Sequence, residues 1–300
     1  MNINAVASNS VSKTGFQNSL KSNKNLNTSF NFEGVNSSKV LSAMDAQSLS
    51  SKAQVSFGSN ADMYELKQIW DIINRTSDKR INDFTMFYGE SEHRFSNPLI
   101  EAARLGSVDA IKVLRQRGAD PNVSINGYTA LMWAAVEGQT EAIEALKQFD
   151  GIDANMKDRH VGYTALMWAA VEGQAEAIKA LKDFKGIDAN KTNIGGKTAL
   201  MLAAKNGRAQ AIKALQDFDD IDVNQVDKEG KTALMFAVNN EEIGAVIALL
   251  EDDRTVISYS PISTILGMYK LSEEIKNPEE KIQYLQLVAK KINDSINLSK

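Results

Sequence analysis

The chain has 300 residues, 43% of them hydrophobic, which is enough apolar side chain for a sizeable core in one or two domains. Its formal net charge is −4 with acidic and basic residues intermixed, so nothing in its charge indicates nucleic acid as a partner. The absence of cysteine excludes disulfides and thiolate metal sites and fits a cytoplasmic protein, and no apolar run approaches the roughly 20 residues that span a membrane.

Residues 1–60 form a polar segment that we expect to be disordered. They include 14 serines and 10 asparagines, and their few phenylalanines are isolated, so they offer little apolar surface to offset the entropy lost on ordering. The start of the chain also lacks the basic and apolar regions of a classical secretory signal. Two interpretations stay open for this tail: a solvated leader without a specific role, or an uncleaved export signal of the bacterial type III or type IV kind.

Residues 61–94 are predicted to form a helical cap. An amphipathic helix is indicated by Asp62 as a possible N-cap and by one apolar stripe, made up of Met63, Leu66, Ile69, Trp70 and Ile73. A second apolar cluster follows and is assigned to the same cap; it consists of Ile81, Phe84, Met86, Phe87 and Tyr88. Trp70 is interpreted as a core residue.

The middle of the chain repeats itself. The stretch from Tyr128 to Asn155 returns almost unchanged from Tyr163 to Asn190, and further copies start at Lys197 and Lys231. The copies place threonines at spacings of 35, 34 and 34 residues, namely Thr129, Thr164, Thr198 and Thr232. A fixed period of this length is typical of a solenoid of stacked units.

One repeat predicts a pair of helices. Thr129 is suited to cap a short helix over 130–136, and Gly138 is suited to the left-handed conformation that ends it. A second helix over 141–149 follows, with its apolar residues one turn apart. The sequence GIDAN then leads the chain to the next threonine.

These residues resemble the ankyrin-repeat family, in which a turn, Thr-Pro-Leu-His, paired alanines, a glycine and a helical apolar run recur; here the match reads GYTALMWAAVEGQ. A weaker unit begins near Asn97, so the resemblance implies five units in an all-α solenoid over residues 95–253. We place them at about 95–123, 124–158, 159–192, 193–226 and 227–253. The family's proline is kept as Pro98 in unit one and is replaced by alanine in units two to five. Its histidine is replaced by Ile100 in unit one and by methionine in the other units. Unit five has Asn240 and Glu241 where a glycine is expected, so we expect a distorted turn there.

After the repeats, residues 254–300 are predicted to form a second helical cap. Pro261 and Pro278 are each suited to open a helix. The first has an apolar face formed by Ile262, Ile265, Leu266, Tyr269, Leu271 and Ile275, and the second has apolar residues at spacings of three and four. An alternative for 278–297 is an amphipathic helix that binds a partner.

No constellation in the sequence supports catalysis. The Gly-Lys-Thr stretches at 196–198 and 230–232 lack the glycine that a phosphate-binding loop needs five residues earlier, where Lys191 and Gln225 stand. His93 and His160 lie far apart without a cysteine or HExxH partner. We therefore expect no metal, cofactor or small-molecule substrate.

The family resemblance implies that a partner binds the concave face, at the turn tips and the exposed ends of the first helices. Carried over by position, the tips are Tyr128, Tyr163, Lys197 and Lys231. The helix ends are Val136, Glu137, Val171, Glu172, Lys205, Asn206, Asn239 and Asn240. Trp133 and Trp168 occupy one equivalent position, where packing between units and partial exposure to a partner are both open.

The resemblance therefore predicts a non-catalytic module that binds a protein. One alternative is a secreted bacterial effector, whose tail directs export and whose repeats bind a host protein. Another is an enzyme with its chemistry in 61–94 or 254–300, although these flanks are poor in polar constellations. The abundant lysine, asparagine and isoleucine and the TALMWAA variant indicate a bacterial source.

Overall fold

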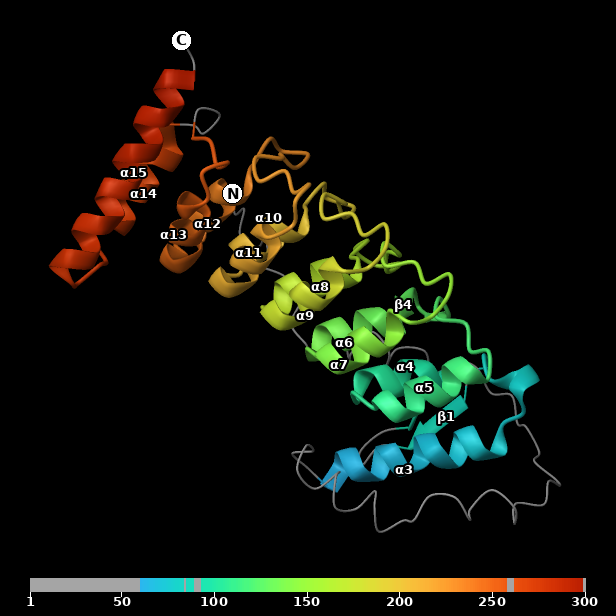
Figure 1. Ribbon diagram of the computed structural model, residues 1–300. Helices are drawn as coiled ribbons and strands as arrows, with labels where there is room; N and C mark the ends of the chain where they lie inside the picture. The colour runs from blue at the N-terminus through green and yellow to red at the C-terminus, as the bar shows by residue number, and fades with distance from the viewer. Residues whose placement is uncertain (1–59, 84, 89–92, 258–261, 299–300) are drawn as a thin grey trace, which may run out of the picture.

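The computed structural model describes residues 60–83, 85–88, 93–257 and 262–298. These residues form a row of helix pairs that runs from α3 at one end to α15 at the other (Figure 1). The tail expected at 1–60 lies outside the described residues, apart from its last residue, which begins α3.

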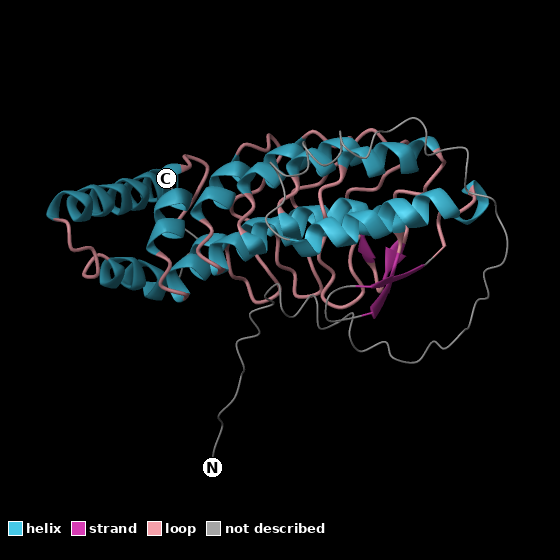
Figure 2. Ribbon diagram, turned by 90° about the horizontal axis from the view of Figure 1, so that it is seen from below, coloured by secondary structure: helices cyan, strands magenta, loops and turns pink. Residues whose placement is uncertain are grey.

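Each repeat contributes an inner helix followed by an outer helix. The inner helices are α4 (Pro98–Arg104), α6 (Ala130–Glu137), α8 (Ala165–Glu172), α10 (Ala199–Lys205) and α12 (Ala233–Asn239). The outer helices are α5 (Val108–Gln116), α7 (Thr140–Leu146), α9 (Ala175–Lys182), α11 (Ala209–Gln216) and α13 (Ile243–Glu251). Inner helices pack on inner helices and outer on outer, which gives the two rows seen in Figure 2. The predicted helical solenoid is confirmed.

The inner helices of units two to five begin at the threonines that the repeat predicts as caps. Each threonine Oγ1 accepts a hydrogen bond of 3.3 Å from the N–H three residues later, which belongs to Met132, Met167, Met201 or Met235. In unit four the N–H of Thr198 also points back to the Met201 sulfur, 3.5 Å away. Methionine, which replaces the family's histidine, thus completes a capping box there.

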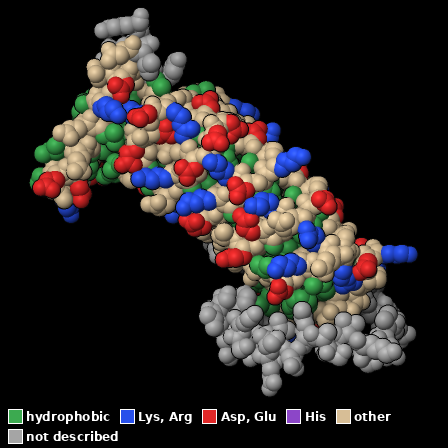
Figure 3. All heavy atoms as spheres, viewed as in Figure 1, with side chains coloured by type: hydrophobic (Ala, Val, Ile, Leu, Met, Phe, Trp, Pro, Cys, Tyr) green, Lys and Arg blue, Asp and Glu red, His purple; other side chains and the backbone are tan. Residues whose placement is uncertain are grey.

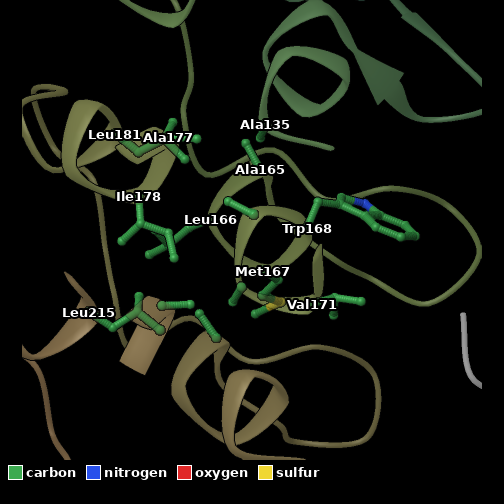
Figure 4. Packing of buried hydrophobic residues seen from close by; sticks show 14 of the residues in the cluster. Ala135, Ala165, Leu166, Met167, Trp168, Val171, Ala177, Ile178, Leu181 and Leu215 are labelled. Carbon is green, nitrogen blue, oxygen red and sulfur yellow. The ribbon is translucent and has the colours of Figure 1, made fainter. Parts of the chain in front are cut away.

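The core lies between neighbouring pairs. Leu166 on α8 is 1% exposed and points toward Ile178 on its own outer helix and Leu215 on the next one (Figure 4). The paired alanines of the inner helices are fully buried, as at Ala134 and Ala135. Side chains this small let successive inner helices approach closely, so each unit covers the apolar face of its neighbour.

Asparagine side chains tie each repeat to the next across the loops. Asn190 Nδ2 donates to the Asp220 carbonyl at 2.7 Å, and Asn190 Oδ1 accepts from the Asp222 N–H at 2.8 Å. The same two-bond bridge, with distances of 2.7 to 2.9 Å, is made by Asn122, Asn155 and Asn224. Asn82 makes one of the two bonds, since its Oδ1 accepts from the Asp120 N–H at 2.7 Å. The asparagine bridges therefore extend from the N-terminal cap to Val256.

The turn between the helices of unit five is regular, so the expectation that it is distorted is wrong. Glu241 adopts φ 60°, close to the 69° of Gly138, and the Glu242 N–H reaches the Ala237 carbonyl at 3.0 Å as its counterparts do in other units. At Gly138 a Cβ would lie 2.6 Å from Gln174 Oε1, which covers that glycine from the next repeat. Glu241 is exposed, so a side chain fits there, although the left-handed conformation costs it about 1 kcal/mol.

The N-terminal cap is only partly helical. The expected helix forms as α3 (Asn60–Arg75) and buries Ile69 and Ile73, but it begins at Asn60, so Asp62 lies within it and is not its N-cap. A short 3₁₀ turn, η1 (Asp78–Arg80), precedes the buried Ile81. The second apolar cluster was expected to be helical, but its residues Met86, Phe87 and Tyr88 lie in β1 (Thr85–Tyr88), antiparallel to β2 (His93–Ser96), while Phe84 lies outside the described residues. The run Thr-Met-Phe-Tyr is short and rich in β-branched and aromatic residues, which favour a strand over a helix.

At the other end, α14 (Ile262–Leu271) packs on α12, and α15 (Pro278–Leu298) packs on α13. Pro278 opens α15 as predicted, while Pro261 lies outside the described residues. The Tyr284 hydroxyl donates to the Met268 carbonyl at 2.9 Å and joins the two helices. Within the described ranges, no helix is long and apolar enough to cross a membrane.

The packing predicts a large cost for truncating Leu166. In Leu166→Ala, the lost burial and the resulting cavity should lower the free energy of unfolding by about 2–5 kcal/mol. Ile194→Ala is the control, because this isoleucine is 61% exposed and should change stability by less than about 0.5 kcal/mol. Urea denaturation measures both, and equal midpoints would contradict the packing described.

The asparagine bridges predict a second effect. Asn190→Ala removes two hydrogen bonds between units three and four and should destabilise the chain by about 1–3 kcal/mol. Asn190→Asp retains an acceptor but loses the donor to the Asp220 carbonyl, so it should also destabilise. Lys191→Ala removes only an exposed ion pair with Asp188 and should cost under about 1 kcal/mol. An Asn190→Ala chain as stable as Lys191→Ala would show that the bridges contribute little.

Candidate functional site

A hairpin-shaped loop precedes the inner helix of units two to five. In unit two it contains β3 (Ser124–Ile125) and β4 (Tyr128–Thr129), joined by Asn126 and Gly127. Both linking residues have positive φ, 55° and 86°, as in the type I′ turn that an Asn-Gly pair favours. Later loops close with one backbone hydrogen bond of 2.9 to 3.0 Å, such as that from the Asp158 N–H to the Tyr163 carbonyl.

Among the exposed side chains of these loops, Arg159, Ile194 and Lys228 are spaced like the repeats. We call these three residues the tip row. The backbone of each crosses a glycine of the preceding loop, and a Cβ on Gly127 would lie 2.5 Å from the Arg159 nitrogen. The Ile194 N–H donates to the Val161 carbonyl at 3.1 Å. Glycine is therefore required for the loops to stack, and this stacking sets the tip row.

The tyrosines predicted as turn tips are packing residues. Tyr128 is 2% exposed and Tyr163 is 7% exposed. Their rings lie 6.0 and 5.0 Å from the Trp168 ring, and Tyr128 also stacks on His160 at 5.7 Å. Burial, followed by the Asp158 carboxylate, raises the pKa of Tyr163, so the phenol stays neutral. The tip residue Arg159 precedes Tyr163 by four residues, and burial leaves both tyrosines almost no surface for a partner.

The other apolar candidates are also buried. Trp133 and Trp168 are 4% and 1% exposed, and Val136 and Val171 are enclosed as well. Figure 4 shows the Trp168 ring pointing away from Leu166. It lies on the loop side of α8, where it contacts the rings of Tyr128 and Tyr163. Of the two interpretations of the tryptophan position, packing between units agrees with the burial.

Four polar candidates already have partners in the chain. Lys197 Nζ lies 3.2 Å from Asp227 Oδ2 and 5.2 Å from the centre of the Phe236 ring, and Lys231 Nζ lies 2.7 Å from Glu229. The Asn206 and Asn240 amides donate to carbonyls of their own helices, at 2.7 and 2.8 Å. These side chains stabilise the loops and the helix ends, and only part of their polar surface faces solvent.

The remaining candidates form a second surface row. Glu137 and Glu172 are half-buried, and Lys205 and Asn239 are exposed. We call these four residues the end row, because they close successive inner helices. An inner helix of seven or eight residues separates it from the loops, which is about 10–12 Å. Its charge changes along the stack from acidic in units two and three to basic or neutral in units four and five.

Asp227 organises the loop of unit five. Its Oδ1 accepts from the N–H groups of Glu229 and Lys231 at 2.9 and 3.0 Å, and its Oδ2 faces Lys197. Burial alone would raise the pKa of this carboxyl, but the two N–H groups and the lysine together lower it below its usual range. The folded chain thus favours the ionised form.

The structure gives the Gly-Lys-Thr stretches the role that the sequence predicts, since they supply a turn and a helix cap. His160 stacks on Tyr128, and His93 lies in β2. No group of three or more His, Asp or Glu side chains that would hold a metal ion occurs in the described part of the chain.

A family model described as ankyrin repeats (3 copies) matches residues 99–193 and 166–258. Together these two matches cover more than half of the chain. Among curated proteins, none shows a significant sequence match.

The Asp227 environment predicts a dependence on pH. Because its pKa is lower in the folded chain, the carboxylate stabilises the fold at neutral pH, and this contribution disappears as pH falls through the folded-state value, below about pH 4. Asp227→Asn retains an oxygen acceptor, as Asn193 does at the equivalent position, but loses the charge. It should cost about 1 kcal/mol at pH 7.

Urea midpoints of both chains between pH 7 and pH 3 test this expectation. The difference between Asp227→Asn and the unaltered chain should shrink on acidification. A difference that stays constant to pH 3 would contradict the assigned pKa direction.

Proposed function

Because the chain belongs to the ankyrin-repeat family, we propose that it is a non-catalytic module that binds a partner protein through the tip row and the end row. Ankyrin repeats characteristically bind proteins, and this supports the general class of function. The choice of these two rows rests on which side chains of the repeats remain exposed after the stack has formed.

The observation that carries the proposal is the exposure of Ile194. This isoleucine is 61% exposed in the middle of the tip row, between the cations Arg159 and Lys228. Neither cation makes an ion pair within the described residues. An apolar side chain surrounded by polar neighbours suits the desolvated centre of a protein interface, and arginine is among the residues enriched there.

Rigidity supports the same proposal. The close approach of successive loops over Gly127 and Gly196 fixes the spacing of the tip row, and the asparagine bridges fix the segments that lead into these loops. A surface held in this way loses little conformational entropy when it binds. The chain would therefore present a preformed surface to its partner.

The effector and enzyme hypotheses remain predictions. Residues 1–59, which would carry an export signal, lie outside the described residues, and attaching residues 1–60 to a reporter tests export directly. Turnover that is lost when His93 and His160 are both replaced would support the enzyme hypothesis.

A paired capture experiment tests the binding surface. The unaltered chain, Arg159→Glu/Ile194→Asp/Lys228→Glu, and the control Glu141→Lys/Lys179→Glu/Lys213→Glu are each used as bait in lysate and analysed by mass spectrometry. The control residues are exposed on the outer helices. We expect a protein that is captured by the unaltered chain and by the control but lost with the tip-row variant.

Circular dichroism of the three baits is the control that each of them is folded. Equal capture by all three baits would contradict the tip row as the binding surface. Loss with the control variant alone would place the interface on the outer helices.

A further inference from the structure

The C-terminal helix pair exposes an apolar surface that the rest of the fold does not use. Of the seven exposed large hydrophobic side chains in the described part of the chain, four lie on α14 and α15: Ile262 (76%), Leu266 (63%), Tyr269 (45%) and Ile282 (55%). We call the three of these residues that lie on α14 (Ile262, Leu266 and Tyr269) the end face. Figure 3 shows hydrophobic side chains gathered at this end of the molecule, where Figure 1 places α14 and α15.

The end face points away from the repeats. Along α14, Thr264, Met268 and Leu271 are buried against unit five at spacings of four and three residues. The exposed Ile262, Leu266 and Tyr269 have the same spacing but begin two residues earlier. At 100° per residue, this offset places them about 160° around the helix axis from the buried stripe. Helix α14 therefore has two apolar stripes on opposite sides, one packed on α12 and one turned outward.

We propose that the end face binds the end face of a second copy of this chain, so that two stacks join through α14 in a two-fold symmetric dimer. Within the chain, each inner helix packs on the inner helix of the next unit, and α14 continues this series from α12. In the dimer, α14 of one copy packs on α14 of the other, so the row of packed inner helices continues into the second copy. The two-fold axis makes this central pair antiparallel, unlike the successive inner helices within one stack.

The spacing of the exposed stripe is self-complementary. Leu266 lies near its middle, with Ile262 one turn before it and Tyr269 about one turn after it. An antiparallel pair of α14 helices related by a two-fold axis brings Leu266 against its own copy and Ile262 against the partner's Tyr269. Each apolar side chain then meets another apolar side chain.

The charges around the end face also favour a like partner. From Lys270 to Lys281 the two helices and their connection carry three lysines and four glutamates, a net charge of −1. The lysines are Lys270, Lys276 and Lys281, and the glutamates are Glu273, Glu274, Glu279 and Glu280. This mixture of charges has no strong complementarity to a highly acidic or highly basic partner. Two copies of it would bring lysines and glutamates together without strong net repulsion.

Sedimentation equilibrium of the full chain tests the proposal. The mass should rise with concentration from 32.9 kDa toward twice that value, with a dissociation constant on the order of micromolar, because the patch is small. Leu266→Asp should stay monomeric. Ile194→Asp is the matched control, since its side chain is equally exposed but lies on a loop tip, and it should dimerise like the unaltered chain.

Crosslinking tests the symmetry independently of any effect on folding. The chain has no cysteine, so Leu266→Cys introduces a single thiol that a short bismaleimide should join to its copy, whereas Ile194→Cys should not be joined. An unaltered chain that stays monomeric throughout the micromolar range would overturn the proposal, and would favour a different occupant of the end face. Dimerisation of Leu266→Asp to the same extent as the unaltered chain would also overturn it.

Discussion

An asparagine amide at the end of each of units one to four binds the loop that follows the next outer helix with two hydrogen bonds. One such amide carries both a donor and an acceptor, so it satisfies a carbonyl and an N–H that the loop leaves without a regular secondary-structure partner. From Asn122 to Asn224 the bridges recur with nearly constant lengths. They set the distance between units on the loop side, while the alanine-lined inner helices set it in the core. The hairpin loops, the glycine crossings and the tip row all depend on this spacing.

Function in this architecture follows from stacking and not from any single repeat. A tip residue such as Ile194 is held because its backbone crosses Gly162 and binds the Val161 carbonyl of the preceding loop. The same stacking encloses the tyrosines and tryptophans, which would be exposed in an isolated unit. The charged and apolar residues that remain outside are thus selected by the neighbouring units, and the stack ends with an unpaired apolar stripe on α14.

The sequence predicts well whatever lies within one unit. The threonine caps, the helix pairs and the period follow from local chemistry and are confirmed. Tyr128 was wrongly predicted to lie at an exposed tip. Its ring is buried against Trp168, which belongs to the next repeat, so a single unit does not reveal the burial. The tip row could have been found in the sequence. Most positions of the unit carry the same residue type in successive repeats, whereas positions 159, 194 and 228 carry Arg, Ile and Lys. The asparagines were visible in GIDAN, but their role depends on a distance between loops. On α14, Ile262 and Leu271 were assigned to one apolar face, although they lie on two opposite stripes.

The measurement that tests the central claim most directly is amide hydrogen exchange in the loops that receive the asparagine bridges. The Asp153 and Asp222 N–H groups lie in exposed loops outside any helix, yet each donates to an asparagine Oδ1 of the preceding repeat. The account predicts that both exchange far more slowly than in an unstructured peptide, and that Asn190→Ala releases Asp222 while leaving Asp153 protected. Exchange of both amides at the unstructured rate in the unaltered chain would contradict it.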